Sequence, residues 1–332
     1  MTTSTEPSHG ANPGTHSHAE IPLPEAKMHL YRPNEPVTAR VTKSEICTSR
    51  KAAGFVRHVE FDVSGTMLAG GTVLPGQSIG VLAPGHDEKG RPHAVRLYSV
   101  ASPTRGEDGH ANVISTTVKR TIDEHWENHK LFLGVASNYL CDLREGDEVR
   151  LSGPNGKKFL IPAAAAGHDY IFFATGTGIA PFRGMVLDLL ASKVKSRIVL
   201  VMGSPYATDL LYDDLFRRLA AEHSNFTYLT ALSRERQADI AHGPMYVQDR
   251  ITANKDDLVP LLSSDRTLIY VCGIAGMELG IFQHMARHLS PGTLEHYLTV
   301  DREAMADITA WNRKMLHRQI KVSKRVFLEV YS

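Results

Sequence analysis

The chain has 332 residues, 42% hydrophobic and 22% charged, which is typical of a globular protein with room for two cores. Its formal net charge of +1 argues against a chain built to coat nucleic acid or anionic lipid. The widely spaced cysteines Cys47, Cys141 and Cys272 exclude a disulfide framework and a four-cysteine iron–sulfur cluster, and they predict a reducing, cytoplasmic location. No apolar run reaches the roughly 20 residues of a membrane span.

Residues 1–27 are rich in Ser, Thr, Pro, Gly and His and lack the patterns of a signal or transit peptide. We expect a disordered tail there. The tail histidines His9, His16 and His18 are interpreted as solvated residues rather than as a metal site, and we predict no metal.

Short β-rich runs broken by Gly and Pro extend from Thr38 to about Leu160. Examples are "VTARVTK", "GFVRHVEFDV", "QSIGVLA", "VRLYSVA", "NVISTTVKR" and "DEVRLSG". Alternating runs with turns between them predict an antiparallel barrel or sandwich. One helix is expected at 137–143, "SNYLCDL", with Ser137 as its N-cap.

The pattern changes in the Ala-rich stretch at 162–168. Buried strands such as "YIFFAT", "RIVLVMG", "FTYLTAL" and "LIYVCG" then alternate with helical runs, which predicts a doubly wound parallel sheet. We therefore expect an antiparallel β-barrel domain at 28–165 and an α/β domain at 166–332. Residues 291–325 are basic and hard to place, and 308–321 is expected to be helical.

The string "ATGTGIAPFR", 174–183, follows a predicted strand and opens a predicted helix. Gly176 and Gly178 permit a tight turn, and a helix N-terminus attracts a pyrophosphate. Pro181 stands in place of the third glycine of the dinucleotide fingerprint and suits a first helical turn. The string is weak evidence alone and gains weight from its strand–turn–helix context.

A second candidate string is "RLYSVAS", 96–102, in which Arg96 could pair with a phosphate, Tyr98 could stack on a flat ring and Ser99 could offer it a hydroxyl. An ordinary strand remains the alternative. The start of the helix near Ser137 could hold a phosphate. Cys272 ends a strand at the sheet edge where ligands gather, although a lone cysteine there is often buried filler.

The order of these strings, with "VKR", "GVASNYLCDL", "SRE", "MYVQ", "VCGIAGME" and the terminal "EVY", resembles the plant-type ferredoxin–NADP reductases. The resemblance covers about residues 30–290 and the last few. It implies an oxidoreductase with the cofactors FAD and NADP(H) and an acidic partner, ferredoxin or flavodoxin. A nicotinamide moves two electrons as a hydride, a ferredoxin accepts one at a time, and a flavin can do both.

The resemblance also implies residue roles. The FAD-binding positions are Arg96, Leu97, Tyr98, Ser99, Val118, Lys119, Gly134, Val135, Ala136 and Ser137. The NADP-binding positions are Thr175, Gly176, Thr177 and Gly178 at the pyrophosphate and Ser233, Arg234, Tyr246 and Gln248 at the 2′-phosphate and adenosine. The catalytic positions beside the reacting rings are Ser99, Cys272, Glu329 and Tyr331, with Tyr331 stacked on the flavin opposite Tyr98.

The chain departs from the family pattern at several places. Pro244 stands where the family has a lysine, so Arg234 must supply most of the charge for a 2′-phosphate unless Arg236 or His242 helps. The tyrosine that stacks on adenine in plant members has no clear counterpart, and Trp126 or His125 could replace it. Ala136 replaces a cysteine common in plant forms.

Two alternative functions stay open. One is a stand-alone reductase that feeds an oxygenase through a separate ferredoxin, and the other is a non-catalytic flavin or nucleotide sensor. A basic partner surface is expected around the FAD side and the tail, formed by Arg32, Lys89, Arg91, Arg313, Lys314, Arg318, Lys321, Lys324 and Arg325.

Overall fold

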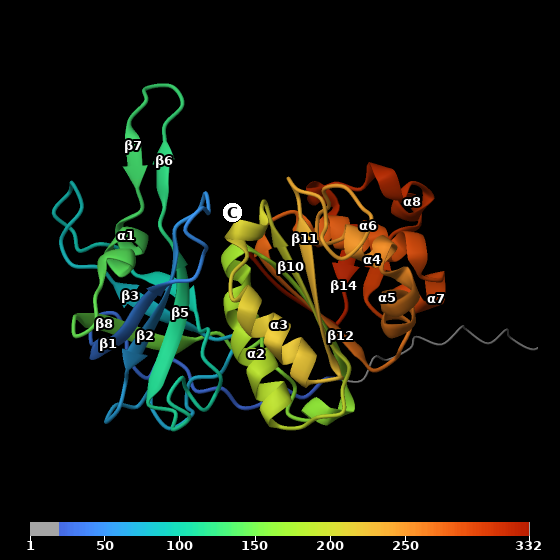
Figure 1. The fold of residues 1–332 in the computed structure, drawn as a ribbon. Coiled ribbons are helices and arrows are strands. Elements are labelled where there is room, and N and C mark those ends of the chain that lie inside the picture. Colours follow the sequence, from blue (N-terminus) through green and yellow to red (C-terminus); the bar gives the residue numbers. More distant parts are fainter. Residues whose placement is uncertain (1–19, 332) are drawn as a thin grey trace, which may run out of the picture.

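The protein is described by a computed structural model covering residues 20–331. Figure 1 shows two lobes: a β-rich lobe from the first half of the chain, in blue to green, and a sheet flanked by helices from the second half, in yellow to red. The predicted fold class, an antiparallel barrel followed by a doubly wound α/β domain, is confirmed. Within the described residues, no helix has the length and apolar character needed to cross a membrane.

The first lobe is a six-stranded antiparallel sheet in the order β4-β3-β8-β1-β2-β5. An isolated bridge between Val100 and Thr116 joins the end of β4 to β5 and closes the sheet into a barrel. Alternate side chains from these strands fill the interior, so the sequence alternation has its expected cause. The strands are β1 (Val37–Ile46), β2 (Val56–Asp62), β3 (Ser78–Leu82), β4 (Arg96–Ser99), β5 (Val113–Lys119) and β8 (Glu148–Asn155).

A two-stranded hairpin projects from the barrel and leads into helix α1 (Figure 1). The hairpin strands are β6 (Ile122–Glu124) and β7 (Leu131–Leu133), and α1 spans Val135–Asp142. The prediction of Ser137 as N-cap is wrong, because the helix begins two residues earlier and its N-cap is Gly134. The Ser137 hydroxyl donates instead to the Gly134 carbonyl at 3.1 Å, inside the first turn.

The second lobe contains a parallel sheet in the order β11-β10-β9-β12-β15. Helices α2 (Ile179–Ala191) and α3 (Asp213–Glu222) pack on one face, and α4 (Asp249–Ala253), α5 (Lys255–Leu262) and α6 (Met277–His288) pack on the other. The chain changes direction between β9 and β12, which is where ligands bind in such sheets. The strands are β9 (Asp169–Thr175), β10 (Ile198–Ser204), β11 (Phe226–Leu232), β12 (Thr267–Ile274) and β15 (Val326–Tyr331).

The helix predicted at 308–321 is wrong. Two short 3₁₀ turns, Ile308–Ala310 and Arg313–Met315, lie there, and strand β14 (Ile320–Val322) follows. The side chains of Asp307 and Asn312 each accept a hydrogen bond from a backbone N–H two residues later, which favours separate turns over a continuous helix. The rest of this segment comprises α7 (Pro291–Leu294), α8 (Arg302–Ala306) and β13 (Leu298–Val300), which pairs with β14.

The tail prediction is wrong for residues 20–27, which lie against the protein. The Pro22 carbonyl accepts from the Ala163 N–H at 3.0 Å, and Ile21 packs on the core of the second lobe. The apolar contact of Ile21 and the backbone hydrogen bond of Pro22 hold this stretch in place, although its composition resembles that of the polar tail before it. Residues 1–19, with the three tail histidines, and Ser332 lie outside the described residues.

Candidate functional site

The barrel carries a groove of about 630 Å³ between β4, the hairpin and the start of α1. It unites two strings that lie far apart in the sequence, the strand at 96–98 and the helix start at 134–137. These are the positions that the sequence assigned to one cofactor. The lining residues are Asp87, His93, Ala94, Arg96, Leu97, Tyr98, Thr121, Phe132, Gly134, Val135, Ala136 and Ser137.

The groove offers a ring, a cation and a helix N-terminus. Burial raises the pKa of Tyr98 to about 12, so its phenol stays neutral while its ring lines the groove. Helix α1 has no side-chain cap, and its first N–H groups have no partner within the helix, so they can bind an anion. A Cβ on Gly134 would lie 2.6 Å from Ser137 Oγ, so a side chain there would distort the helix start. This donor set fits a flat ring linked to a pyrophosphate, as in FAD.

Three further positions predicted to bind FAD differ in how exposed their side chains are. Ser99 is half-buried at the end of β4, and its carbonyl accepts from Thr116 Oγ1 at 2.8 Å. The Val118 side chain is buried in the barrel core, so only its backbone could face a ligand. Lys119 is exposed on the adjoining surface. Trp126, at the hairpin tip, is 82% exposed and therefore available for stacking.

The second ligand region lies at the switch point between β9 and β12. The turn Gly176–Gly178 continues directly into α2, and Gly176 has a φ of +53°, which favours glycine. A Cβ on Gly178 would lie 2.2 Å from the Cys272 carbonyl oxygen, so the turn packs directly on the end of β12. The Thr175 hydroxyl accepts from the Ile274 N–H at 2.9 Å and fixes the same junction. The backbone is therefore fixed at the start of an uncapped helix.

Cys272, Glu329 and Tyr331 are brought together by the register of the last strand. Cys272 pairs with Glu329, and Ile274 with Tyr331, in the parallel ladder between β12 and β15. Cys272 is 1% exposed, and burial, reinforced by Glu329, raises the pKa of its thiol. A buried neutral thiol is not a nucleophile, so Cys272 can contribute only packing at this edge.

Tyr331 covers the turn that precedes α2. Its hydroxyl and that of Thr177 are hydrogen-bonded at 2.8 Å, and 44% of the residue remains exposed. Burial raises the pKa of the phenol to about 12, against the opposing effect of the Thr177 hydrogen bond. The tyrosine is thus a partly exposed cover on the turn rather than a core residue. Besides the Thr177 bond, its hydroxyl interacts with the Gly178 backbone, and its carbonyl accepts from the Ala275 N–H at 2.8 Å.

Glu329 is a carboxyl group poised near neutrality. Burial raises its pKa to about 7, and its Oε2 atom is buried without a hydrogen-bond partner. The residue also lines a cavity of about 370 Å³, together with Glu278 and His317. Sequence reasoning missed His317, because it belongs to the segment that could not be placed.

The predicted 2′-phosphate residues follow β11 at the same edge of the sheet. The N–H groups of Ser233 and Arg234 donate to the carbonyls of Ser204 and Pro205, each at 3.0 Å. The Arg234 guanidinium lies 5.8 Å from the ring centre of Tyr206, within the range of a cation–π contact. Sequence reasoning missed Tyr206, although the "GSPY" string after a predicted strand was a signal for it.

The remaining predicted positions flank this loop. Tyr246 and Pro244 are both exposed. Because Pro244 occupies the family's lysine position, no side-chain cation is present there. Gln248 precedes α4 and lies against Gly280 of α6.

Two of the predicted partner-surface residues form ion pairs in the structure. Arg91 is paired with Asp87 at 2.7 Å, and Lys324 is paired with Glu20 at 3.2 Å. The basic partner surface as a whole stays a prediction.

A closed antiparallel barrel with a ring-and-anion groove, joined to a doubly wound domain with a glycine turn at its switch point, defines the class of two-domain nucleotide-dependent oxidoreductases. Comparisons with known proteins agree. Residues 172–282 match the family model of the oxidoreductase NAD-binding domain. The ferredoxin–NADP reductase of Spirulina sp. is 38% identical over 265 residues, which are 78% of this chain and 88% of that protein.

The chain belongs to the ferredoxin–NADP reductase family. The Synechocystis sp. reductase is also 38% identical, over 76% of this chain, which spans 62% of the length of that relative. The chloroplastic leaf isozyme 1 of Oryza sativa subsp. indica is 37% identical over 76% of this chain and 69% of its own. The solved ferredoxin–NADP⁺ reductase of Plasmodium falciparum shares the fold, with a TM-score of 0.65 at 21% identity, over 81% of this chain and 97% of that chain.

Proposed function

We propose that the protein is an FAD-dependent oxidoreductase that exchanges electrons between NADP(H) and ferredoxin or flavodoxin. Family membership supports the activity. The observation that supports this activity for the present chain is that Cys272, Glu329 and Tyr331 lie together at one sheet edge, directly beside the glycine turn. When bound, FAD supplies two-electron exchange with the nicotinamide and one-electron exchange with the carrier.

The barrel groove holds FAD in this proposal. The Tyr98 ring packs on the flat ring system, and the free N–H groups at Val135–Ser137 hold the pyrophosphate. Arg96, exposed at the groove, adds a cation for a phosphate. The FAD-binding domain is proposed to span 28–165 and the NADP-binding domain 166–332.

The turn at 175–178 receives the NADP pyrophosphate, and the Ser233–Arg234 loop receives the 2′-phosphate. Both lie at the carboxyl edge of one parallel sheet, so a single extended dinucleotide can reach both. Arg234 is the proposed determinant of preference for NADPH over NADH, because Pro244 adds no charge. Tyr246 is exposed and can stack on the adenine.

Tyr331 acts as a displaceable cover in this proposal. Its ring leaves the flavin-facing side of the turn when the nicotinamide enters, and its bond to Thr177 re-forms when the nucleotide leaves. Aromatic stacking contributes about 0.5–1.5 kcal/mol, which is enough to hold the position and small enough to be displaced. Cys272 is buried behind the cover and becomes a contact for the nicotinamide once the cover moves.

Glu329 is only partly ionised at neutral pH in this proposal. With a pKa near 7, its Oε2 can take up or release a proton without a large free-energy cost, which suits a reaction that releases one proton for each NADPH consumed. The carboxyl group also lines a cavity that it shares with Glu278 and His317.

The test is spectroscopic. Purified protein loaded with FAD should be yellow, should lose its colour anaerobically with NADPH, and should regain it on addition of oxidised ferredoxin or flavodoxin. Protein that does not bind FAD, or whose bound FAD is not reduced by NADPH, would contradict the proposal. A sensor would bind both ligands without passing electrons to the carrier. The assembled Cys272, Glu329 and Tyr331 give no support to that alternative.

Where the reaction takes place is part of the proposal. All three cysteines are free in the structure, and each is half-buried or buried. This supports the cytoplasm as the compartment.

A further inference from the structure

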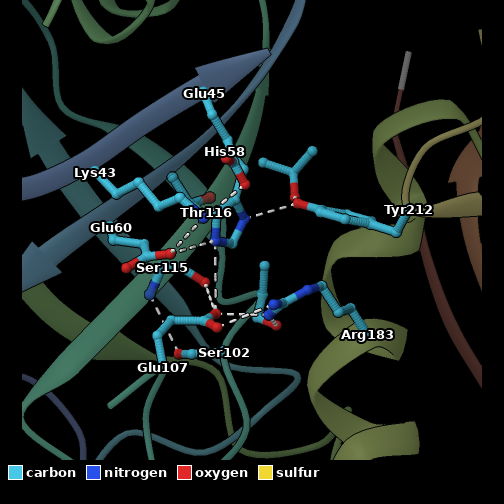
Figure 2. A network of polar contacts seen from close by, with 12 residues as sticks. Lys43, Glu45, His58, Glu60, Ser102, Glu107, Ser115, Thr116, Arg183 and Tyr212 are labelled. Atoms are coloured by element: carbon cyan, nitrogen blue, oxygen red, sulfur yellow. Dashed lines mark hydrogen bonds and ion pairs between the residues drawn. The ribbon is translucent and has the colours of Figure 1, made fainter. Parts of the chain in front are cut away.

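A buried polar cluster joins the two lobes away from both ligand regions. We call it the joint cluster; it comprises His58, Glu60, Glu107, Arg183 and Tyr212. Figure 2 shows that the first three side chains come from the barrel, and that Arg183 and Tyr212 reach them from the helical lobe.

His58 is the centre of the joint cluster and is only 2% exposed. Its Nδ1 atom is hydrogen-bonded to the Tyr212 hydroxyl at 2.9 Å, and that hydroxyl also contacts Thr117 Oγ1 at 2.5 Å. Its Nε2 atom lies 3.4 Å from Glu60 Oε1 and 3.6 Å from Glu107 Oε1. Oxygen atoms therefore face both ring nitrogens.

Glu107 ties the same cluster to helix α2. Arg183 donates to both of its carboxylate oxygens, at 2.5 and 2.9 Å, and Ser115 donates at 2.6 Å. Burial alone would raise the pKa of Glu107, but Arg183 and the neighbouring His58 hold it below its usual range. The guanidinium also lies 5.2 Å from the ring centre of Tyr212 and donates to the Ala101 carbonyl.

Within the joint cluster itself, the charges balance when His58 is protonated. Glu60 and Glu107 carry two negative charges and Arg183 one positive charge, all on mostly buried groups. Lys43 is half-exposed, lies 2.9 Å from Glu45 and stands 3.8 Å from Glu60, so it is mainly matched by its own partner. Cys47 faces Arg183 and Tyr212, and burial raises the pKa of its thiol to about 12, so it adds no charge. An unbalanced buried charge is costly.

We propose that His58 is an imidazolium and a positioning residue, which together with Arg183 fixes helix α2 against the barrel. Arg183 lies five residues after Gly178, about 7.5 Å along the same helix at 1.5 Å per residue. Because an α-helix is stiff over that length, a shift at the joint moves the turn at Thr177 and Tyr331 relative to Tyr98. The consequence for catalysis rests on the proposed function, whereas the charge state of His58 does not.

A metal ion is the competing occupant of the cluster, because His58, Glu60 and Glu107 present ligand atoms within 4.8 Å of one another. The Glu107 oxygen nearest to His58 already accepts hydrogen bonds from Arg183 and Ser115. A cation there would also stand next to the guanidinium. A proton on His58 would place a positive charge 3.4 Å from Glu60 Oε1 and 3.6 Å from Glu107 Oε1 without that conflict, although Nε2 makes no hydrogen bond to either carboxylate.

The first experiment observes the His58 ring nitrogens directly. In the FAD-loaded protein, ¹⁵N spectra at neutral pH should show both ring nitrogens of His58 protonated. The signal is assigned through its shift in Tyr212→Phe, which removes one hydroxyl and no charge. A ring with one unprotonated nitrogen would overturn the proposal. So would a stoichiometric metal ion in the purified protein that is lost in His58→Gln.

The second experiment separates positioning from general stability. His58→Gln keeps an N–H donor but no charge, and should slow flavin reduction by NADPH roughly 10- to 100-fold through misalignment. Binding of 2′-phospho-AMP, which needs only the helical lobe, should be unchanged. An unchanged reduction rate, or equal losses of rate and 2′-phospho-AMP binding, would overturn the positioning role. If the parent protein is not reduced by NADPH at all, the proposed function fails, and the ring-nitrogen result still decides the charge of His58.

Discussion

The two ligand regions share an uncapped helix N-terminus that follows a glycine, but only the second region is covered by a side chain. Each places an uncapped helix N-terminus behind a glycine, Gly134 before α1 and Gly178 before α2, where a Cβ would collide with its surroundings. The barrel groove has a volume of about 630 Å³ lined by residues of β4, the hairpin and α1, whereas Tyr331 covers the turn at α2 through its bond to Thr177. A cover held by weak contacts suits a ligand that must arrive and leave at each cycle.

The largest expected effect comes from distorting the glycine turn of the second ligand region, which precedes α2. In Gly178→Ala the new Cβ meets the Cys272 carbonyl, so backbone must move, at a cost of about 1–3 kcal/mol in stability. NADP⁺ binding, measured by titration of the yellow protein, should be lost while FAD remains. Gly134→Ala should do the reverse, and Gly167→Ala, which meets nothing within 4 Å, is the neutral control. Loss of both ligands in each of the first two variants would show that the regions are not independent.

The next largest effect concerns the preference for NADPH over NADH, which we assign to Arg234. Arg234→Ala removes the proposed charge partner of a 2′-phosphate, and a charge-assisted hydrogen bond contributes about 1.5–3 kcal/mol. The ratio of kcat/KM for NADPH to that for NADH should therefore fall roughly 10- to 100-fold. Arg236→Ala, on the same loop, tests whether the second arginine contributes to the preference. A parent protein that uses both nucleotides equally would contradict the pocket assignment.

Glu329 should make stability depend on pH. Its pKa is about 7 in the folded protein against 4.5 as the ordinary value, so between these pH values the folded state keeps a proton that the unfolded state has lost. The free energy of unfolding therefore falls as pH rises through this window and stays lowered above it. With allowance for partial exposure, the loss is about 1–2 kcal/mol.

Denaturant unfolding of the FAD-loaded protein across this pH range measures the effect. Glu329→Gln has no carboxyl group to ionise, so its stability relative to the parent should improve with rising pH. Parallel pH profiles for the two proteins would mean that Glu329 is ionised in the folded state, which would also remove its proposed role as a proton holder.

The smallest effect concerns Tyr206, whose ring supports the Arg234 guanidinium. A cation–π contact at an exposed site contributes about 0.5–1 kcal/mol, so Tyr206→Leu should reduce the preference for NADPH roughly 2- to 5-fold. Tyr206→Phe keeps the ring and should keep the preference. The ratio of NADPH to NADH efficiency distinguishes the two variants. If the phenylalanine variant loses as much as the leucine variant, the hydroxyl rather than the ring is what matters.

Much of this comparison could be predicted from the sequence, because local patterns encode it. Alternating strands, buried strands and the "ATGTGIAPFR" turn specify the barrel, the parallel sheet and the switch-point loop through short-range physics. The position of Ser137 in α1 was misjudged, because the close packing of Gly134 on Thr121 is a tertiary contact that no local pattern reveals.

The segment at 291–325 shows the limit more clearly. Its apparent helix is divided by Asp307 and Asn312, and the indole of buried Trp311 donates to the Ala304 carbonyl at 2.8 Å. Only that fold brings His317 to the cavity beside Glu329. The joint cluster was invisible for the same reason. His58 and Glu107 are distant in sequence and meet in the folded barrel, and Arg183 reaches them only after the two lobes pack.

The most direct test of the account is NADP⁺ titration of the FAD-loaded protein with and without the Tyr331 ring. Tyr331→Ser removes the cover, so the nicotinamide no longer has to displace a ring worth about 0.5–1.5 kcal/mol. NADP⁺ should then bind roughly 2- to 10-fold more tightly, and turnover should fall because product leaves slowly. Tyr331→Phe, which keeps the ring and loses only the hydroxyl with its bonds to Thr177 and the Gly178 backbone, should stay close to the parent. A serine variant that binds NADP⁺ no more tightly and keeps its turnover would show that Tyr331 is not the cover.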